Sequence, residues 1–129
     1  MTAALVCTAL LGLLVFGLGL GVSALRGSTS TNIGHKLDPG DPLHKMVRAH
    51  GNATEYSPML AILMLAIAGR GAPPWMVWTF AAATLSRYLH AAGMVLSSSL
   101  DRPQPLRFVG ALGTYVTGLM LVVALLLVV

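Results

Sequence analysis

The sequence predicts an all-α membrane protein whose fold is a bundle of four transmembrane helices. The first observation is composition: 56% of the 129 residues are hydrophobic and 9% are charged, whereas about a quarter of a soluble chain is charged. The second is a mean hydropathy of +0.80. The third is order along the chain, because apolar runs of about 20 residues, enough to cross a bilayer as helices, alternate with three short polar segments.

The first predicted span covers residues 3–25 and is followed by Arg26. A secretory signal peptide is the alternative, but its apolar region is usually shorter and follows basic residues. This segment begins without Lys or Arg, so we interpret it as a retained helix. Gly17 and Gly21 have the spacing that allows helices to approach closely. Glycine is also simply common in membrane helices, and the sequence leaves both interpretations open.

The second predicted helix covers residues 42–69 and begins after a polar loop. Asp41 followed by Pro42 is a good N-cap and first-turn pair. The helix is longer than a bilayer requires, so its first half should lie at the interface and its second half in lipid. Pro58 lies inside it and should kink it.

The last two predicted spans cover residues 75–98 and 106–128, which places the whole chain, residues 1–129, in one membrane domain. Trp75 and Trp78 open the third span, where aromatic residues anchor helices at the interface. Gly110, Thr114 and Gly118 give the fourth span a face of small residues for packing.

Four spans place both termini on the same side of the membrane. The first and third loops, with the adjacent helix ends, carry six Lys and Arg residues, and the second loop carries Arg70. The excess of basic residues predicts that loops one and three are cytoplasmic and both termini lie outside. Short loops and the lack of a targeting extension favour a bacterial inner membrane.

Several classes of function are disfavoured by the sequence. The net charge of +4 comes from scattered residues without a basic tract, so we expect no nucleic-acid partner. The four histidines are not clustered at metal-ligand spacing, so we expect no metal. The sequence also lacks a Ser-His-Asp arrangement and a glycine-rich phosphate loop, which disfavours a hydrolase or a nucleotide enzyme.

Charged residues inside the predicted spans mark the candidate site. Arg48, Asn52 and Glu55 fall on one stripe of the second helix, because a helix turns about 100° per residue. Arg87 lies midway along the third span, where an arginine costs about 3 kcal/mol on insertion scales. Glu55 is the carboxylate able to reach that depth, so we predict an Arg87–Glu55 ion pair. His90, one turn after Arg87, is either packed and hydrogen-bonded or a ligand contact.

These residues predict a polar pocket at the cytoplasmic end of the bundle. Arginine pairs with carboxylates through two parallel hydrogen bonds, so the pocket suits a small anionic ligand. Its apolar walls would admit a lipophilic second ligand from the surrounding lipid.

The motif Arg48-Ala49-His50-x-Asn52-x-x-Glu55-Tyr56-x-Pro58 closely resembles the second-helix signature of the MAPEG family. This family comprises membrane-associated proteins in eicosanoid and glutathione metabolism, including the microsomal glutathione transferases. The pair Arg87-x-x-His90 and the segment Pro105-Leu106-Arg107 are similar to supporting motifs of the third and fourth helices. The resemblance extends over nearly the whole chain.

The resemblance implies a homotrimer that binds glutathione as co-substrate between neighbouring subunits, near the cytoplasmic side. It implies a transferase or peroxidase-like reaction in which the glutathione thiolate attacks a lipophilic electrophile. Arg107 resembles the arginine credited with stabilising that thiolate. By the same resemblance, seven residues match positions that contact glutathione or line its site in the family: Arg26, Arg48, Asn52, Glu55, Tyr56, Arg87 and His90.

The sequence also departs from the family pattern. Gly51 replaces an arginine that binds glutathione in some members, and Met94 and Ala111 occupy positions where active eicosanoid enzymes have tyrosine. These departures leave open a non-catalytic membrane binding or scaffold protein of the same fold, as the lipoxygenase-activating protein of the family is. A small transporter or channel subunit, with Arg87 and Glu55 in an ion path, is a third hypothesis.

Overall fold

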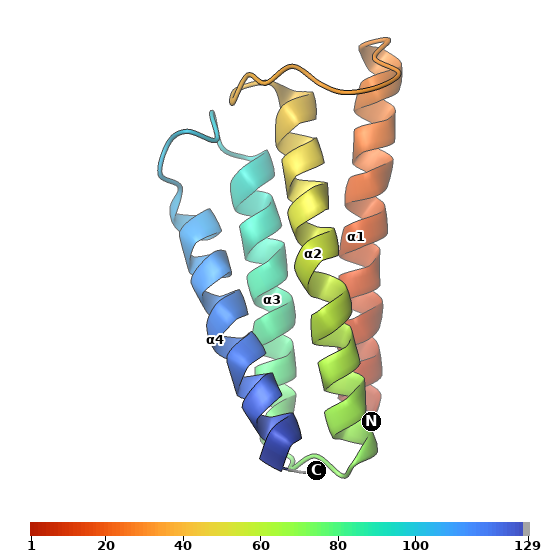
Figure 1. The fold of residues 1–129 in the computed structure, drawn as a ribbon, viewed down its shortest axis with the longest axis vertical. Helices are drawn as coiled ribbons and strands as arrows, with labels where there is room; N and C mark the ends of the chain where they lie inside the picture. The colour runs from red at the N-terminus through yellow and green to blue at the C-terminus, as the bar shows by residue number, and fades with distance from the viewer. Residues whose placement is uncertain (128–129) are drawn as a thin grey trace.

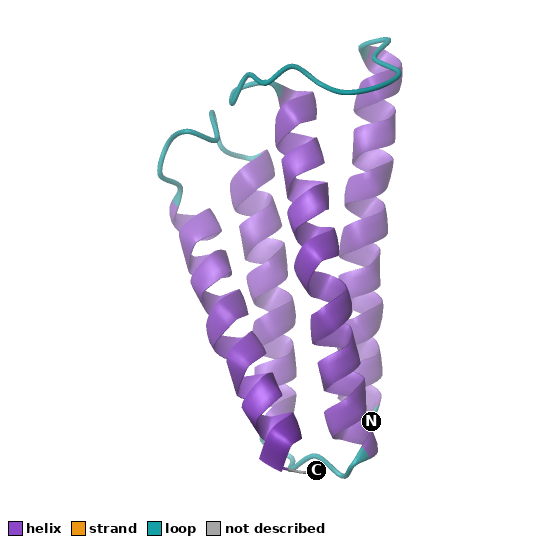
Figure 2. Cartoon of the chain, viewed as in Figure 1, coloured by secondary structure: helices purple, strands orange, loops and turns teal. Residues whose placement is uncertain are grey.

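The computed structural model describes residues 1–127, which form four helices and no strands (Figures 1 and 2). The helices are α1 (Thr2–Ser28), α2 (Pro42–Gly69), α3 (Met76–Val95) and α4 (Pro105–Leu127). They run alternately up and down as one bundle, as the sequence predicts. The N-terminus and the end of α4 lie at one end, which we call the terminal end (Figure 1). The α1–α2 and α3–α4 loops lie at the other, which we call the loop end.

Helices α2 and α3 are central to the bundle. Each of them contacts the other three helices, whereas α1 and α4 do not contact each other within the described residues. Polar side chains on α2 and α3 can therefore be covered by neighbours on several sides. This arrangement explains how Arg87 is buried, at 1% exposed, in a bundle of this size.

The start of α2 and the loop end are fixed by specific hydrogen bonds. Asp41 is the N-cap, as predicted: its Oδ1 accepts a hydrogen bond from His44 N at 2.9 Å. Leu100 N donates to Pro39 O at 2.9 Å, which joins the two loops, and Lys45 Nζ donates to Ser97 O at 2.8 Å. Helix α2 continues through Pro58 to Gly69.

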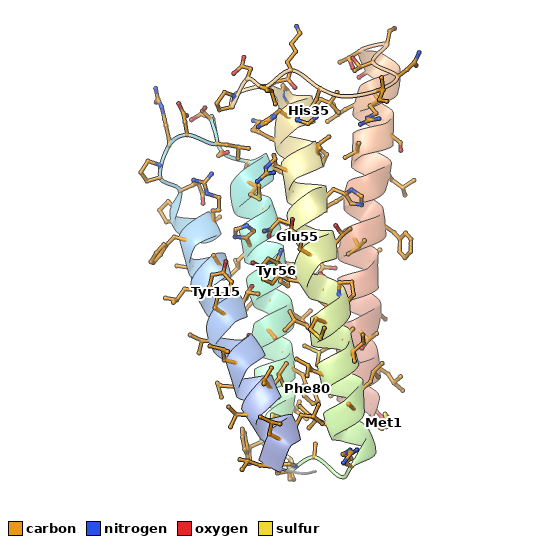
Figure 3. The ribbon with its side chains drawn as sticks, viewed as in Figure 1. Met1, His35, Glu55, Tyr56, Phe80 and Tyr115 are labelled. Carbon is orange, nitrogen blue, oxygen red and sulfur yellow. The ribbon has the colours of Figure 1, made fainter. Side chains whose placement is uncertain are left out.

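The apolar core occupies the half of the bundle towards the terminal end, where Phe80 is labelled in Figure 3. Helix α1 contributes Ala4, Cys7 and Leu11 to this core. The polar residues of the candidate site lie closer to the loop end. The buried core residues are Ala4, Cys7, Leu11, Leu60, Leu63, Met64, Ile67, Met76, Phe80, Ala83 and Leu121.

Glycine allows α3 and α4 to approach closely. A Cβ atom built on Gly93 would overlap the backbone of Arg107, and one built on Gly110 would overlap the backbone of His90. Gly110 and Thr114 are buried, so the predicted small-residue face of the fourth helix is a packing face. In α1 the result is mixed: Gly21 lies against Met46 of α2, but Gly17 faces open space.

The outer surface of the bundle is strongly apolar. Helices α1 and α4 are long and apolar enough to cross a membrane, and outward residues such as Phe16 (76% exposed) and Leu126 (71% exposed) are large and hydrophobic. Trp75 and Trp78 are also exposed, beside the α2–α3 turn. Contiguous apolar surface of this extent is typical of contact with lipid or with partner subunits.

Candidate functional site

Arg87 of α3 is the centre of the polar half of the bundle. Its Nη2 donates to Oδ1 of Asn52 at 2.6 Å and to the Asn52 carbonyl oxygen at 3.1 Å. Its Nη1 donates to Oγ1 of Thr114 at 3.3 Å, and the guanidinium carbon lies 5.1 Å from the centre of the Tyr56 ring. One buried cation thus joins α2, α3 and α4 through an amide, a hydroxyl and an aromatic face.

The predicted Arg87–Glu55 ion pair is wrong. Among the described residues Arg87 takes its acceptors from Asn52 and Thr114, and the Glu55 side chain is exposed with no hydrogen bond or ion pair. The physical reason is position along the helix. Asn52 lies level with the guanidinium and offers it both a side-chain and a main-chain oxygen. Glu55 instead lines two cavities, which are described below.

Tyr56 forms a second contact between α2 and α4. Its hydroxyl lies 3.2 Å from that of Tyr115, and the two rings meet edge to face with centroids 5.8 Å apart. Figure 3 labels this pair beside Glu55 on the ribbon. Tyr115 was not among the predicted site residues, although its position one turn after Ala111 could have indicated it.

A polar cavity of about 460 Å³ lies along the first turns of α2 and under the α1–α2 loop. We call it the α2 cavity. Three predicted site residues, Arg48, Asn52 and Glu55, line it together, as their helical spacing predicts. The full lining is His35, Leu37, His44, Val47, Arg48, Gly51, Asn52 and Glu55. Gly51 lines this cavity, and a Cβ atom built on it would meet nothing within 4 Å, so the structure has space for a side chain at this position.

A second cavity, of about 660 Å³, lies beside the start of α4. We call it the α4 cavity, and it brings together His90, Arg107 and Ala111. His90 Nδ1 lies 2.9 Å from the carbonyl oxygen of Arg107, so His90 is both a packed, hydrogen-bonded residue and a cavity-lining residue. The other lining residues are Pro103, Gln104, Pro105 and Phe108.

The Arg107 side chain is oriented by the α3–α4 loop. Its Nη1 donates to Leu100 O at 2.9 Å and its Nη2 to Arg102 O at 3.1 Å. Its backbone N donates to Oε1 of Gln104 at 2.7 Å. Because a guanidinium has five N–H donors, these contacts leave three donors for a ligand in the α4 cavity.

An apolar groove of about 510 Å³ runs between α2 and α4. We call it the interhelix groove. Glu55, Tyr56 and Tyr115 lie at its polar edge, and the remaining lining is Met59, Leu60, Leu63, Thr114, Gly118, Leu119 and Val122. Glu55 lines both this groove and the α2 cavity. A polar ligand in one and a lipophilic ligand in the other would therefore meet at Glu55.

The predicted site residues do not all line one cavity of the chain. Arg48, Asn52 and Glu55 line the α2 cavity, whereas His90 and Arg107 line the α4 cavity. Arg26 lies at the end of α1, where its Nη1 donates to Asn32 O at 3.2 Å, and it lines neither cavity. His35, His44 and Thr114 were not predicted as site residues. His35 and His44 line the α2 cavity because the α1–α2 loop lies against the start of α2, and Thr114 accepts from Arg87, 27 residues earlier in the chain.

Nothing in residues 1–127 resembles a metal centre, since no three His, Cys, Asp or Glu side chains lie close enough to share an ion. The site is instead built from guanidinium, amide, carboxylate, imidazole and phenol groups. Such groups bind an organic ion through hydrogen bonds and charge.

The model of the MAPEG family matches residues 4–127, which is nearly the whole chain. Searches of curated proteins and of solved structures found no match. The helical fold, the apolar outer surface and the motif on α2 agree with this match. The chain belongs to the MAPEG family, a family of helical membrane proteins.

Proposed function

We propose that this protein binds glutathione, or a similar small thiol, and uses its thiolate to attack a lipophilic electrophile. The observation that carries this proposal is the α2 cavity, in which Arg48, Asn52 and Glu55 of the family motif share one polar space. In this proposal all four helices cross the membrane, with loops one and three on the cytoplasmic side.

Binding of an anionic peptide is supported by the state of Arg48. Its side chain is exposed and has no hydrogen bond or ion pair among the described residues, so its donors are available to a carboxylate. Arg87 fixes the Asn52 side chain, because its Nη2 donates to Asn52 Oδ1. The proposed roles are peptide binding for Arg48, Asn52, Glu55 and Tyr56, and positioning for Arg87.

Arg107 is the proposed catalytic residue. Lowering the pKa of a thiol from about 8.5 by two units requires roughly 3 kcal/mol. Three free N–H donors of Arg107 beside the α4 cavity can supply that stabilisation. The thiolate sulfur then forms a bond to the electrophilic carbon, and the displaced electron pair leaves with the leaving group, such as chloride, or goes to an electron-withdrawing atom of the substrate that takes a proton from water. With a hydroperoxide, the sulfur instead attacks the terminal oxygen and the O–O bond breaks, which releases an alcohol after protonation and leaves a sulfenic acid. A second thiol then attacks that sulfur, which forms a disulfide and releases water.

The lipophilic substrate is proposed to lie in the interhelix groove. Its lining is almost entirely apolar below the Tyr56–Tyr115 pair, and such a groove accepts a hydrocarbon tail. Because Glu55 is shared with the α2 cavity, a substrate there would have its polar end beside the thiol ligand.

A homotrimer is part of the same proposal. The residues for peptide binding and for thiolate stabilisation line different cavities of one protomer. A ligand bound between neighbouring protomers would contact the α2 cavity of one and the α4 cavity of the next. Arg26 of a neighbour could then approach the same ligand. Cross-linking or native mass spectrometry of the purified protein tests the oligomeric state.

The first experiment is a glutathione titration of the full-length protein in detergent, followed by the ultraviolet absorbance of the thiolate. We expect a saturable thiolate signal in the wild type and in Arg102→Ala, because Arg102 contributes only a backbone carbonyl to the site. We expect the signal to disappear in Arg107→Ala. If the wild type binds glutathione without a thiolate signal, the proposed catalytic role of Arg107 is wrong. If it does not bind glutathione, glutathione is not its ligand.

A non-catalytic binding or scaffold protein is the second candidate. The specific observation in its favour is the absence of a hydroxyl at Ala111, which lines the α4 cavity with Arg107. Met94 likewise has no hydroxyl and is buried. In this alternative the protein binds glutathione or a lipid without forming a thiolate, and the same titration separates the two functions.

A further inference from the structure

Two histidines, nine residues apart in the chain, meet at the loop end of the α2 cavity. The rings of His35, from the α1–α2 loop, and His44, from the first turns of α2, have centroids 4.8 Å apart with a tilt of 52°. Both line the α2 cavity. In Figure 3, His35 is labelled at the loop end, nearer the end of the bundle than Glu55.

The His44 ring has no hydrogen-bond partner in the described part of the chain. Its Nδ1 is buried and unpaired, and its backbone N is already occupied by Asp41 Oδ1. No side-chain hydrogen bond holds the ring, so a turn about its Cβ–Cγ bond towards a ligand in the cavity that His44 lines would break none. A buried ring nitrogen without a partner is costly, so a ligand that supplies one gains affinity.

The charges around His44 favour a negatively charged partner. Arg48 follows His44 by one helical turn on the same face, lines the same cavity and is itself unpaired. The carboxylate that lines the cavity is Glu55, which lies roughly 10 Å further along the helix from Arg48 at 1.5 Å per residue. The Asp41 carboxylate accepts from His44 N at 2.9 Å but does not line this cavity. The cavity wall at the loop end therefore presents two neighbouring donor side chains, His44 and Arg48.

We propose that His44 and Arg48 form a carboxylate-binding subsite for the thiol ligand, with the His35 ring as its wall. The inference rests on the proposed function, because the ligand it describes is the small peptide thiol. It adds that His44 donates to one of the two carboxylates of a glutathione-like peptide, which makes His44 a determinant of specificity. A thiol without that carboxylate loses the contact.

The experiment uses full-length protein in detergent and three thiols, with Kd measured by isothermal titration. The first thiol is glutathione, the second is glutathione with its glycyl carboxylate esterified, and the third is 4-aminobutyryl-cysteinylglycine, which lacks the α-carboxylate. We expect His44→Ala to raise the Kd of glutathione about tenfold, since a hydrogen bond to a charged group is lost. We expect the same variant to leave the Kd of one analogue unchanged, and that analogue identifies the carboxylate.

Two amide variants separate a donor role from simple packing. His44→Asn places an N–H near the position of Nδ1, and His44→Gln places one near Nε2. We expect one of them to retain more affinity than His44→Ala, which identifies the donating nitrogen. Lys36→Ala is the charge control, because Lys36 neighbours His35 in the chain but lines a different cavity.

The outcomes separate this inference from the proposed function. Three results would overturn the subsite while glutathione binding stands. They are an equal rise in the Kd of all three thiols in His44→Ala, an unchanged Kd of glutathione in His44→Ala, and a Kd in both amide variants as high as in His44→Ala. Failure of the wild type to bind any of the three thiols would overturn both. Circular dichroism and the thermal unfolding midpoint of each variant show whether a loss comes from unfolding instead.

Discussion

Nη2 of Arg87 lies 2.6 Å from Oδ1 of Asn52, so the cation buried in α3 is held by an amide of α2 and not by a carboxylate. The guanidinium therefore keeps its positive charge uncompensated by an ion pair within the described residues. Its field and its hydrogen bonds fix the position of Asn52, which lines the α2 cavity. Arg87 is thus the structural support of the motif that binds the proposed ligand.

Removal of Arg87 should destabilise the bundle in a way that a second substitution repairs. Arg87→Met leaves the Asn52 amide without its buried partner, and we expect a loss of about 1–3 kcal/mol. In Arg87→Met/Asn52→Leu both groups are gone, and Thr114 still donates to Gly110 O at 2.7 Å, so most of the loss should be recovered. Thermal unfolding in detergent measures both. A double variant no more stable than Arg87→Met would contradict this account.

Gly110→Ala should separate α3 from α4. The added Cβ would overlap the backbone of His90, and overpacking of this kind costs about 1–3 kcal/mol. The same displacement should break the hydrogen bond between His90 Nδ1 and Arg107 O. Gly27→Ala is the matched control, because its Cβ would meet nothing within 4 Å. Equal unfolding midpoints for the two variants would argue against close packing at Gly110.

The pH dependence of the proposed reaction should depend on Arg107. A thiolate stabilised by a cation has a lowered pKa, so it is present above that pKa and is lost as the pH falls through it. If the pKa of the thiol falls by two units from about 8.5, the thiol bound to the wild type should titrate at about pH 6.5. In Arg107→Ala the conjugation rate should reach half its maximum about two pH units higher. A model electrophile such as a chloronitrobenzene serves as substrate, and superimposed profiles would exclude this role.

A tyrosine at position 111 should raise catalysis if the protein is an enzyme. Ala111 lines a cavity of about 660 Å³, which has room for the added ring, whereas Met94 is 7% exposed and has none. We therefore expect Ala111→Tyr to increase the conjugation rate while the unfolding midpoint is kept. Met94→Tyr should instead lower the midpoint. Ala111→Phe adds the ring without the hydroxyl. If this variant raises the conjugation rate as much as Ala111→Tyr does, the hydroxyl is not the cause of the increase.

The helices and the family can be predicted from the chain alone. Runs of about 20 apolar residues have few alternatives to a helix in lipid, because every backbone polar group must be paired. Local signals, such as Asp41 and Pro42 at the start of α2, depend on neighbouring residues and are therefore readable from the chain. For the same reason the stripe of Arg48, Asn52 and Glu55 could be assigned to one cavity from helical spacing.

The tertiary structure decided which partners these residues take. Arg87 bonds to Asn52 and not to Glu55 because of how α2 and α3 are shifted along and rotated about their axes relative to each other. The residue pattern of one helix does not specify these positions. The contact of Tyr56 with Tyr115 joins residues 59 positions apart in the chain, and that of His35 with His44 depends on how the α1–α2 loop lies against the start of α2. The close approach of α3 and α4 is likewise tertiary, and glycines such as Gly110 allow it through the side-chain atoms they lack.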